Sequence, residues 1–261
     1  MLPVSGLTLR VREATGADEL VVLEPGGSAV ATIVTLASRL TTDSQGRMPA
    51  WEELPAADVG AIALTIRQAW LGEWISTDAR CPSPGCLERM DIAFAIPAYI
   101  AHHRPRPHAG VAPGHDANWF ELDRTSGSSP ASVSFRLPTI GDLRDAMASA
   151  DPEGFLRGRC VRPIAIPAAT ARRVSRAMTA LAPSLTGEVT VQCPACGSSH
   201  ELRFDPVTYS LTELRDAAAG LYEEVHLLAS AFHWPEDAIL ALPRSRRARY
   251  ADRIRQERAA A

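Results

Sequence analysis

The chain has 261 residues with 46% hydrophobic content, enough for one large domain or two small ones with an ample core. Its formal net charge of −3 excludes a general electrostatic attraction to nucleic acid or membranes, and no apolar run approaches the roughly 18 residues that a membrane span needs. All the basic residues are arginines. This excludes a catalytic lysine, Schiff-base chemistry and a Walker phosphate loop.

The N-terminal segment predicts strands over residues 7–11 and 19–24, separated by a turn centred on Gly16. Ser28 is predicted to cap a helix whose apolar face reaches Leu40, and a second helix is expected after Pro55. The first residues lack the charged and apolar regions of a signal peptide, so we expect a cytoplasmic protein. Disulfides are rare in that compartment, and paired cysteines there favour a metal.

Two short cysteine motifs follow predicted helices, Cys81-Pro-Ser-Pro-Gly-Cys86 and Cys193-Pro-Ala-Cys196. A cysteine pair held by a Pro or Gly turn presents two thiolates from one side, and two such pairs make a tetrahedral four-sulfur site that suits structural Zn²⁺. The sequence therefore predicts Zn²⁺ bound by Cys81, Cys86, Cys193 and Cys196. Reduced thiols without metal are the alternative. Cys160 is interpreted as a small buried apolar residue.

The two motifs belong to an apparent internal duplication. Leu54-Pro-Ala-Ala-Asp58 is matched by Ile166-Pro-Ala-Ala-Thr170, 112 residues later, and both copies run to their first cysteine without a gap. Upstream, residues 9–18 are echoed by residues 135–142. Such tandem similarity indicates two copies of one unit. We therefore predict an α+β fold in which two pseudo-repeated zinc-knuckle units, each helix-knuckle-strand, form a shared ribbon, followed by a C-terminal three-helix module.

The predicted boundaries place the first repeat at residues 1–96 and the second at residues 132–207. Between them, residues 97–131 are interpreted as a flexible His/Pro/Gly-rich loop. This loop holds four of the seven histidines, namely His102, His103, His108 and His115. A second metal site is the alternative there, but we favour a solvated loop with incidental histidines.

Residues 208–261 are predicted to form a helical docking module with an arginine-rich end. An apolar stripe suits a groove on a partner protein, and the arginines suit an acidic rim. The residues predicted to contact a partner are Tyr222, Val225, Leu228, Phe232, Trp234, Ile239, Leu242, Arg244, Arg246, Arg247 and Tyr250. The alternative is a zinc-ribbon protein that binds nucleic acid through the arginine-rich helix. The arginines have almost no aromatic neighbours, which weakens that alternative.

No catalytic motif is recognisable in the sequence. Gly-x-Ser-x-Gly, His-Glu-x-x-His and Gly-x-Gly-x-x-Gly patterns are all missing from it. A four-cysteine zinc site is coordinatively closed and leaves no position for a water nucleophile. We therefore expect no enzymatic activity.

Three groups of residues resemble a known family. Arg10-Val-Arg-Glu13 with Gly16-Ala-Asp-Glu19, and Phe135-Arg-Leu-Pro-Thr139 with the second cysteine motif, resemble the baseplate hub assembly chaperones of contractile phage tails. The end of the chain, from Leu221 to Arg247, is similar to a small helical module from the gene clusters of extracellular contractile injection systems. The resemblance implies a non-enzymatic structural or assembly component whose partners are baseplate, hub or spike proteins. It also implies that the protein is incorporated into, or acts on, a tail-like particle.

Overall fold

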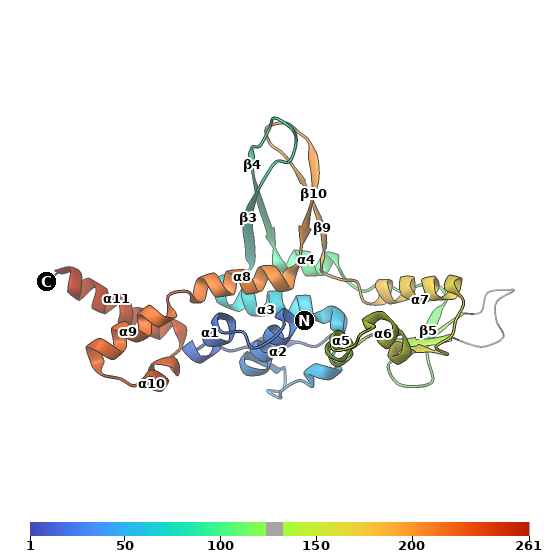
Figure 1. Ribbon diagram of the computed structural model, residues 1–261, viewed down its shortest axis with the longest axis horizontal. Helices are drawn as coiled ribbons and strands as arrows, with labels where there is room; N and C mark the ends of the chain where they lie inside the picture. Colours follow the sequence, from blue (N-terminus) through green and yellow to red (C-terminus); the bar gives the residue numbers. More distant parts are fainter. Residues whose placement is uncertain (124–132, 261) are drawn as a thin grey trace.

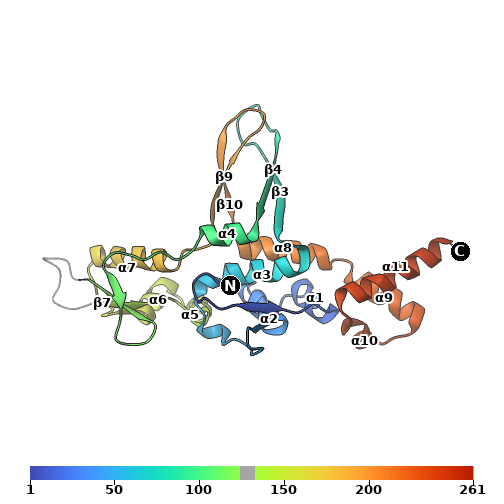
Figure 2. The ribbon, with the colours of Figure 1, turned by 180° about the vertical axis from the view of Figure 1, so that it is seen from behind.

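The computed structural model describes residues 1–123 and 133–260. Two β-hairpins stand on a helical body, with the last helices of the chain at one end of the body and a small sheet at the other (Figure 1). The view from behind shows the same arrangement, with the tips of the hairpins together at the point farthest from the body (Figure 2). The hairpins are therefore the part of the molecule that projects from the helices.

The first half of the chain forms the middle of the body and one hairpin. Strand β1 (Leu9–Val11) pairs antiparallel with β2 (Thr41–Asp43), and two helices separate them in the sequence, α1 (Gly16–Leu23) and α2 (Ala29–Leu40). The elements that follow are the 3-10 turns η1 (Trp51–Glu53) and η2 (Ala56–Asp58), helix α3 (Val59–Leu71), strands β3 (Trp74–Arg80) and β4 (Arg89–Ala95), and helix α4 (Ile96–His102).

Residues 133–218 follow a similar order of elements. Strand β7 (Val133–Arg136) pairs antiparallel with β8 (Val161–Arg162), with α5 (Ile140–Met147) and α6 (Pro152–Cys160) between them in the sequence. The remaining elements are helix α7 (Ala168–Leu181), strands β9 (Gly187–Gln192) and β10 (Ser199–Phe204), and helix α8 (Pro206–Ala218). Each half thus contains a strand, two helices, a strand, a helix, a hairpin and a final helix.

The segment predicted to be a flexible loop over residues 97–131 is more ordered than expected. It contributes α4 and two strands, β5 (Val111–Pro113) and β6 (Trp119–Leu122), which extend the β7–β8 pair into an antiparallel sheet of order β5-β6-β7-β8. Phe120 stacks on Phe135, and the Arg162 guanidinium lies 4.0 Å from the Trp119 ring centroid. These partners lie outside the segment, so its local pattern did not reveal them. Residues 124–131 lie outside the described part of the chain.

The last three helices pack around a core of their own. They are α9 (Leu221–Phe232), α10 (Glu236–Leu240) and α11 (Arg244–Ala260), and their buried residues are Leu227, Leu228, Ile239, Ala251 and Ile254. Helix α8 instead packs on α1, α2 and α3, where Leu211 and Leu214 join the main core. Residues 208–218 therefore lie in the body and not with the three terminal helices, although they were grouped with those helices in the predicted module.

The strand predicted over residues 19–24 is wrong, because residues 19–23 lie in α1 and Glu24 follows its last turn. Thr15 and Asp18 form a capping box, in which the Thr15 backbone N–H donates to the Asp18 carboxylate at 2.9 Å. The β-branched pair Val21-Val22 suggested a strand, but the cap and the burial of Val22 in the helical core decide the outcome. The helix predicted after Ser28 is confirmed as α2, with the Ser28 hydroxyl accepting from the Ala31 N–H.

Candidate metal centre

Each cysteine pair lies at the tip of one hairpin. In the first hairpin β3 pairs with β4 from Trp74–Ala95 to Arg80–Arg89, and in the second β9 pairs with β10. The Cys81 N–H donates to the Glu88 carbonyl at 2.8 Å, and the Cys193 N–H donates to the Ser198 carbonyl at 2.9 Å. A strand therefore precedes each knuckle, and the two hairpins form separate two-stranded sheets in place of one shared ribbon.

The tips bring the four predicted cysteines together. Their Sγ atoms all lie within 4.8 Å of one another. The Sγ atoms of Cys81 and Cys196 are 3.7 Å apart, and those of Cys86 and Cys193 are 3.8 Å apart. Both of these distances join one hairpin to the other, so the cluster is the contact between the tips.

These distances fit a tetrahedral metal ion. Four sulfurs at about 2.3 Å from a Zn²⁺ ion form a tetrahedron with edges of about 3.8 Å. The two measured separations match such edges. Cys81 and Cys193 are buried, Cys86 is half-buried and Cys196 is exposed. Cys81, Cys86, Cys193 and Cys196 could thus hold a metal ion, with the side of Cys196 facing solvent.

Two of the four thiols, those of Cys86 and Cys196, have pKa values shifted in opposite directions. Hydrogen bonds from Ser198 lower the pKa of Cys196 to about 5. The backbone N–H of Glu88 lowers the pKa of Cys86, but desolvation and hydrogen bonds with the neighbouring thiols outweigh it and raise that pKa to about 12. The thiolate form of Cys196 is therefore favoured and that of Cys86 is opposed, and a bound cation would favour the thiolate form of Cys86 as well.

His200 is a residue of this centre that the sequence did not single out. Its Nε2 atom lies 3.3 Å from the Cys81 sulfur and 3.3 Å from the Ser83 hydroxyl. It therefore contacts one sulfur and links strand β10 to the tip of the other hairpin. Groups that donate to metal-bound ligands orient them and tune their affinity. Its position four residues after Cys196 was the available signal.

The remaining candidate ligands do not form a second centre. Within residues 1–123 and 133–260, no other group of three His, Cys, Asp or Glu side chains has metal-site geometry. His102 and His103 lie beside each other at the end of α4, with ring centroids 5.2 Å apart. Cys160 is buried as predicted, and this burial raises the pKa of its thiol to about 11.

The residues predicted to contact a partner divide into two sets. Leu228 and Ile239 are fully buried, and Val225, Trp234, Leu242 and Tyr250 pack against the core of the terminal helices. Tyr222 and Phe232 are exposed, although the Tyr222 hydroxyl also donates to Glu24. Of the apolar side chains in the predicted set, Tyr222 and Phe232 thus remain the most accessible.

The arginines of α11 are largely paired within the chain. Arg247 is buried and pairs with Glu19 of α1 and with Glu224 of α9, and Arg244 also pairs with Glu19. Arg253 pairs with Glu257, and Arg255 pairs with Glu223 and Asp252. Arg246 and Arg249 are exposed. Four arginine side chains of α11 are thus already paired with carboxylates of the same chain. The ion pairs therefore give no specific support to the alternative that α11 binds nucleic acid.

No protein-family model matches the chain, and no curated protein or solved structure is significantly similar to it. Within the described ranges, no helix combines the length and the apolar character that crossing a membrane requires.

Proposed function

We propose that the four cysteines bind one Zn²⁺ ion with a structural role. The observation that carries this proposal is the spacing of their sulfurs, which matches the edges of a tetrahedral Zn–S₄ site. Tetrahedral four-sulfur sites select Zn²⁺ or iron among common metals, and a closed Zn²⁺ site has no free position for catalysis. When bound, the ion would supply cross-links between the hairpins, with a binding free energy on the order of 10 kcal/mol.

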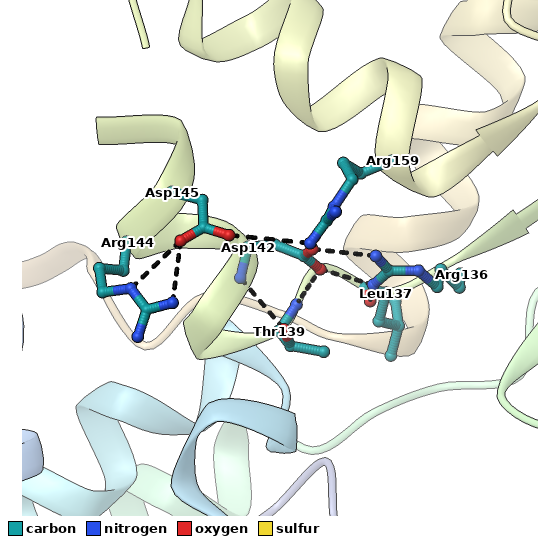
Figure 3. Close-up of polar contacts among 7 residues, drawn as sticks. All are labelled: Arg136, Leu137, Thr139, Asp142, Arg144, Asp145 and Arg159. Carbon is teal, nitrogen blue, oxygen red and sulfur yellow. Dashed lines mark hydrogen bonds and ion pairs between the residues drawn. The ribbon is translucent and has the colours of Figure 1, made fainter. Parts of the chain in front are cut away.

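The two halves of the body are proposed to be copies of one unit. Asp18 and Asp142 support this, because each is buried in the first turn of a helix and its carboxylate accepts a hydrogen bond from the N–H of the N-cap threonine. Arg12 and Arg39 bind the first carboxylate, and Arg136 and Arg159 bind the second (Figure 3). The equivalent of Arg136 is thus Arg12, because each arginine lies six residues before the aspartate that it binds.

A further part of the proposal concerns the biological role. The chain is a non-enzymatic structural or assembly component of a phage tail-like contractile particle, and it acts on baseplate, hub or spike proteins. The support is the sequence resemblance of three segments, together with a four-cysteine cluster that would leave no open coordination position on a bound Zn²⁺ ion. Its terminal helices are the proposed docking element, with Phe232 and Arg246 among the exposed residues.

The zinc proposal is tested by metal analysis of the purified full chain. We expect one Zn²⁺ per chain, X-ray absorption with four sulfur neighbours, and loss of the metal in Cys193→Ser. Cys160→Ser is the matched control, because Cys160 lies outside the cluster, and it should keep the metal. A chain that binds no metal in zinc-supplemented medium, or that shows a nitrogen or oxygen in the coordination sphere, would contradict the proposal.

The assembly role is tested in cells that produce contractile particles from a gene cluster containing this chain. Deletion of its gene should remove complete baseplates from particles seen by electron microscopy, and a tagged chain should co-purify with baseplate or hub proteins. Phe232→Glu and Arg246→Glu should weaken that co-purification and leave the zinc content unchanged. Normal particles after gene deletion would refute the role.

A further inference from the structure

Two long segments of the chain contain no acidic residue. Residues 92–115 hold two arginines and four histidines, and residues 163–187 hold three arginines, without an Asp or Glu in either segment. The whole chain has 30 acidic residues and a net charge of −3, so both segments depart from its general charge balance. Positive charge is therefore concentrated in two stretches that are distant in the sequence.

The fold brings these two segments side by side. The Arg106 N–H donates to the Ala180 carbonyl of α7 at 2.8 Å, and Val111 packs against a core that includes Val174 of the same helix. The chain that follows α4 therefore runs antiparallel along α7. Both views show α4 at the foot of the hairpins and α7 on its side away from α9 and α11 (Figures 1 and 2).

A cavity of about 470 Å³ lies where the end of α4 meets the C-terminal half of α7. Its lining includes Arg104, Arg106 and Arg176, together with the rings of His102 and His103. Among the described residues, no carboxylate side chain lines this cavity. Its volume falls within the range of about 300–1,000 Å³ that is common for small-ligand sites.

The three arginines of the cavity carry charges that the chain does not neutralise. All three are exposed, and within residues 1–123 and 133–260 none of them forms an ion pair. The Arg176 Nε–H donates to the Arg172 carbonyl at 3.4 Å, which is a neutral acceptor. The cavity therefore presents three guanidinium groups without a counter-charge, and this arrangement favours an anionic ligand.

The number of arginines indicates which anion fits. Elsewhere in the chain, one buried carboxylate is shared by two arginines, because Arg136 and Arg159 both pair with Asp142. A phosphate group carries up to two negative charges and three acceptor oxygens, and guanidinium groups bind such oxygens in bidentate pairs. Three arginines around one cavity therefore match a phosphate better than a single carboxylate.

We propose that this cavity binds a phosphate-bearing ligand, whose phosphate oxygens are held by Arg104, Arg106 and Arg176. A small phosphate compound, such as a nucleotide, and the backbone of a single-stranded nucleic acid both offer this chemistry. The proposal goes beyond the metal and assembly roles and rests on neither of them.

The test is isothermal titration calorimetry of the purified full chain with sodium pyrophosphate. We expect saturable binding at one site, weakened by added salt. Arg104→Gln and Arg176→Gln should each lower the affinity by about tenfold or more, because each removes charged hydrogen bonds. Arg258→Gln is the matched control, since it removes the same charge from an exposed position at the end of α11, and it should change the affinity by less than about twofold.

A pair of variants at Thr179 separates charge from shape. Thr179 is exposed in the lining of the cavity, so both variants should fold. Thr179→Glu places a carboxylate beside the arginines and should abolish pyrophosphate binding, whereas Thr179→Gln has nearly the same size without the charge and should retain it. Equal binding by the two variants would overturn the proposal.

Further titrations identify the source of the phosphate. Tighter binding of ATP than of a thymidine oligonucleotide would assign the site to a small phosphate compound, and the reverse order would assign it to a nucleic-acid backbone. Either result supports the proposal if Arg176→Gln weakens the binding. The proposal would be overturned if none of these phosphates bound, or if a polyglutamate peptide bound as tightly as they do. Because no measurement here uses zinc or contractile particles, such a failure would leave the metal and assembly roles untouched.

Discussion

Leu87 occupies, in the first hairpin tip, the left-handed backbone position that Gly197 occupies in the second. Each residue follows the second cysteine of its pair, with φ of 53° for Leu87 and 72° for Gly197. A non-glycine residue pays about 1–2 kcal/mol for this conformation, whereas glycine adopts it without a steric penalty. Both tips therefore need a residue with a left-handed backbone conformation at this position. Glycine meets this need without strain in the second tip, whereas Leu87 is strained in the first tip.

We expect Leu87→Gly to raise the stability of the metal-loaded chain by about 0.5–1 kcal/mol, since the extra entropy of glycine in the unfolded chain offsets part of the gain. Little burial is lost, because Leu87 is 63% exposed. Urea unfolding would measure the change. Gly197→Ala is the reciprocal variant and should lower stability by about 1 kcal/mol. A less stable Leu87→Gly chain would argue against strain at the tip.

The buried carboxylate of Asp142 predicts a dependence of stability on pH. Desolvation alone would raise the pKa of Asp142, but hydrogen bonds from Arg136, Thr139 and Arg159 outweigh it and hold the pKa well below its usual range. A depressed folded-state pKa contributes stability that is present above the unfolded value of about 3.9 and is lost as the pH falls toward the folded value.

Asp142→Asn should therefore destabilise the chain by about 2–3 kcal/mol at pH 7, because it leaves Arg136 without its carboxylate. The difference from the unmodified chain should shrink as the pH is lowered below 4. Urea unfolding at pH 7 and pH 3 measures both effects. Asp91→Asn is the control, because the Asp91 side chain is 83% exposed, and it should change stability by about 0.5 kcal/mol or less. A constant difference between Asp142→Asn and the unmodified chain across this pH range would contradict the argument.

His200 should tune the affinity of the cluster for Zn²⁺ without being a ligand. Its Nε2 atom contacts the Cys81 sulfur, so its removal takes away a hydrogen-bonding group but leaves four sulfurs in place. We expect His200→Ala to lower the Zn²⁺ affinity by about 10–100-fold at unchanged stoichiometry. Competition with a chromophoric chelator measures the affinity. His226→Ala, at an exposed position on α9, should have no effect, and an equal affinity in both variants would exclude a tuning role for His200.

The cysteine cluster could be predicted from the sequence because two cysteine pairs in Pro- or Gly-containing turns are typical of a metal site, and because the two pairs follow matching segments. The strand before Cys81 could not be predicted from the sequence, since the polar run from Ser76 to Arg80 lacks a clear apolar alternation. Helix α1 was not predicted, because Val21 and Val22 are β-branched and favour a strand, whereas the capping box formed by Thr15 and Asp18 favours a helix. The role of His200 depends on its contacts with Cys81 and Ser83 of the other hairpin, and these become visible only when both halves are in place.

Gly16 controls how the terminal helices attach to the body. A Cβ atom at this position would lie 2.8 Å from Arg247 Nη1 and 3.1 Å from the Leu240 backbone. The first is a contact with the buried arginine that pairs with Glu19, and the second is with a main-chain atom that cannot move alone. Thr15 also forms a β-bridge with Pro243, directly before α11. Helices α10 and α11 therefore pack directly against the N-terminal turn of α1.

Gly16→Ala should accordingly push α10 and α11 away from α1, at a cost of about 1–3 kcal/mol from overpacking. Amide hydrogen exchange should become faster in α10 and α11 and stay unchanged in the two hairpins, which are far from this contact. Gly158→Ala is the matched control, because a Cβ atom at Gly158 within α6 meets nothing within 4 Å. Its stability should be equal or higher by up to about 1 kcal/mol. If Gly16→Ala left exchange in α11 unchanged, the close approach at Gly16 would not be what positions the terminal helices.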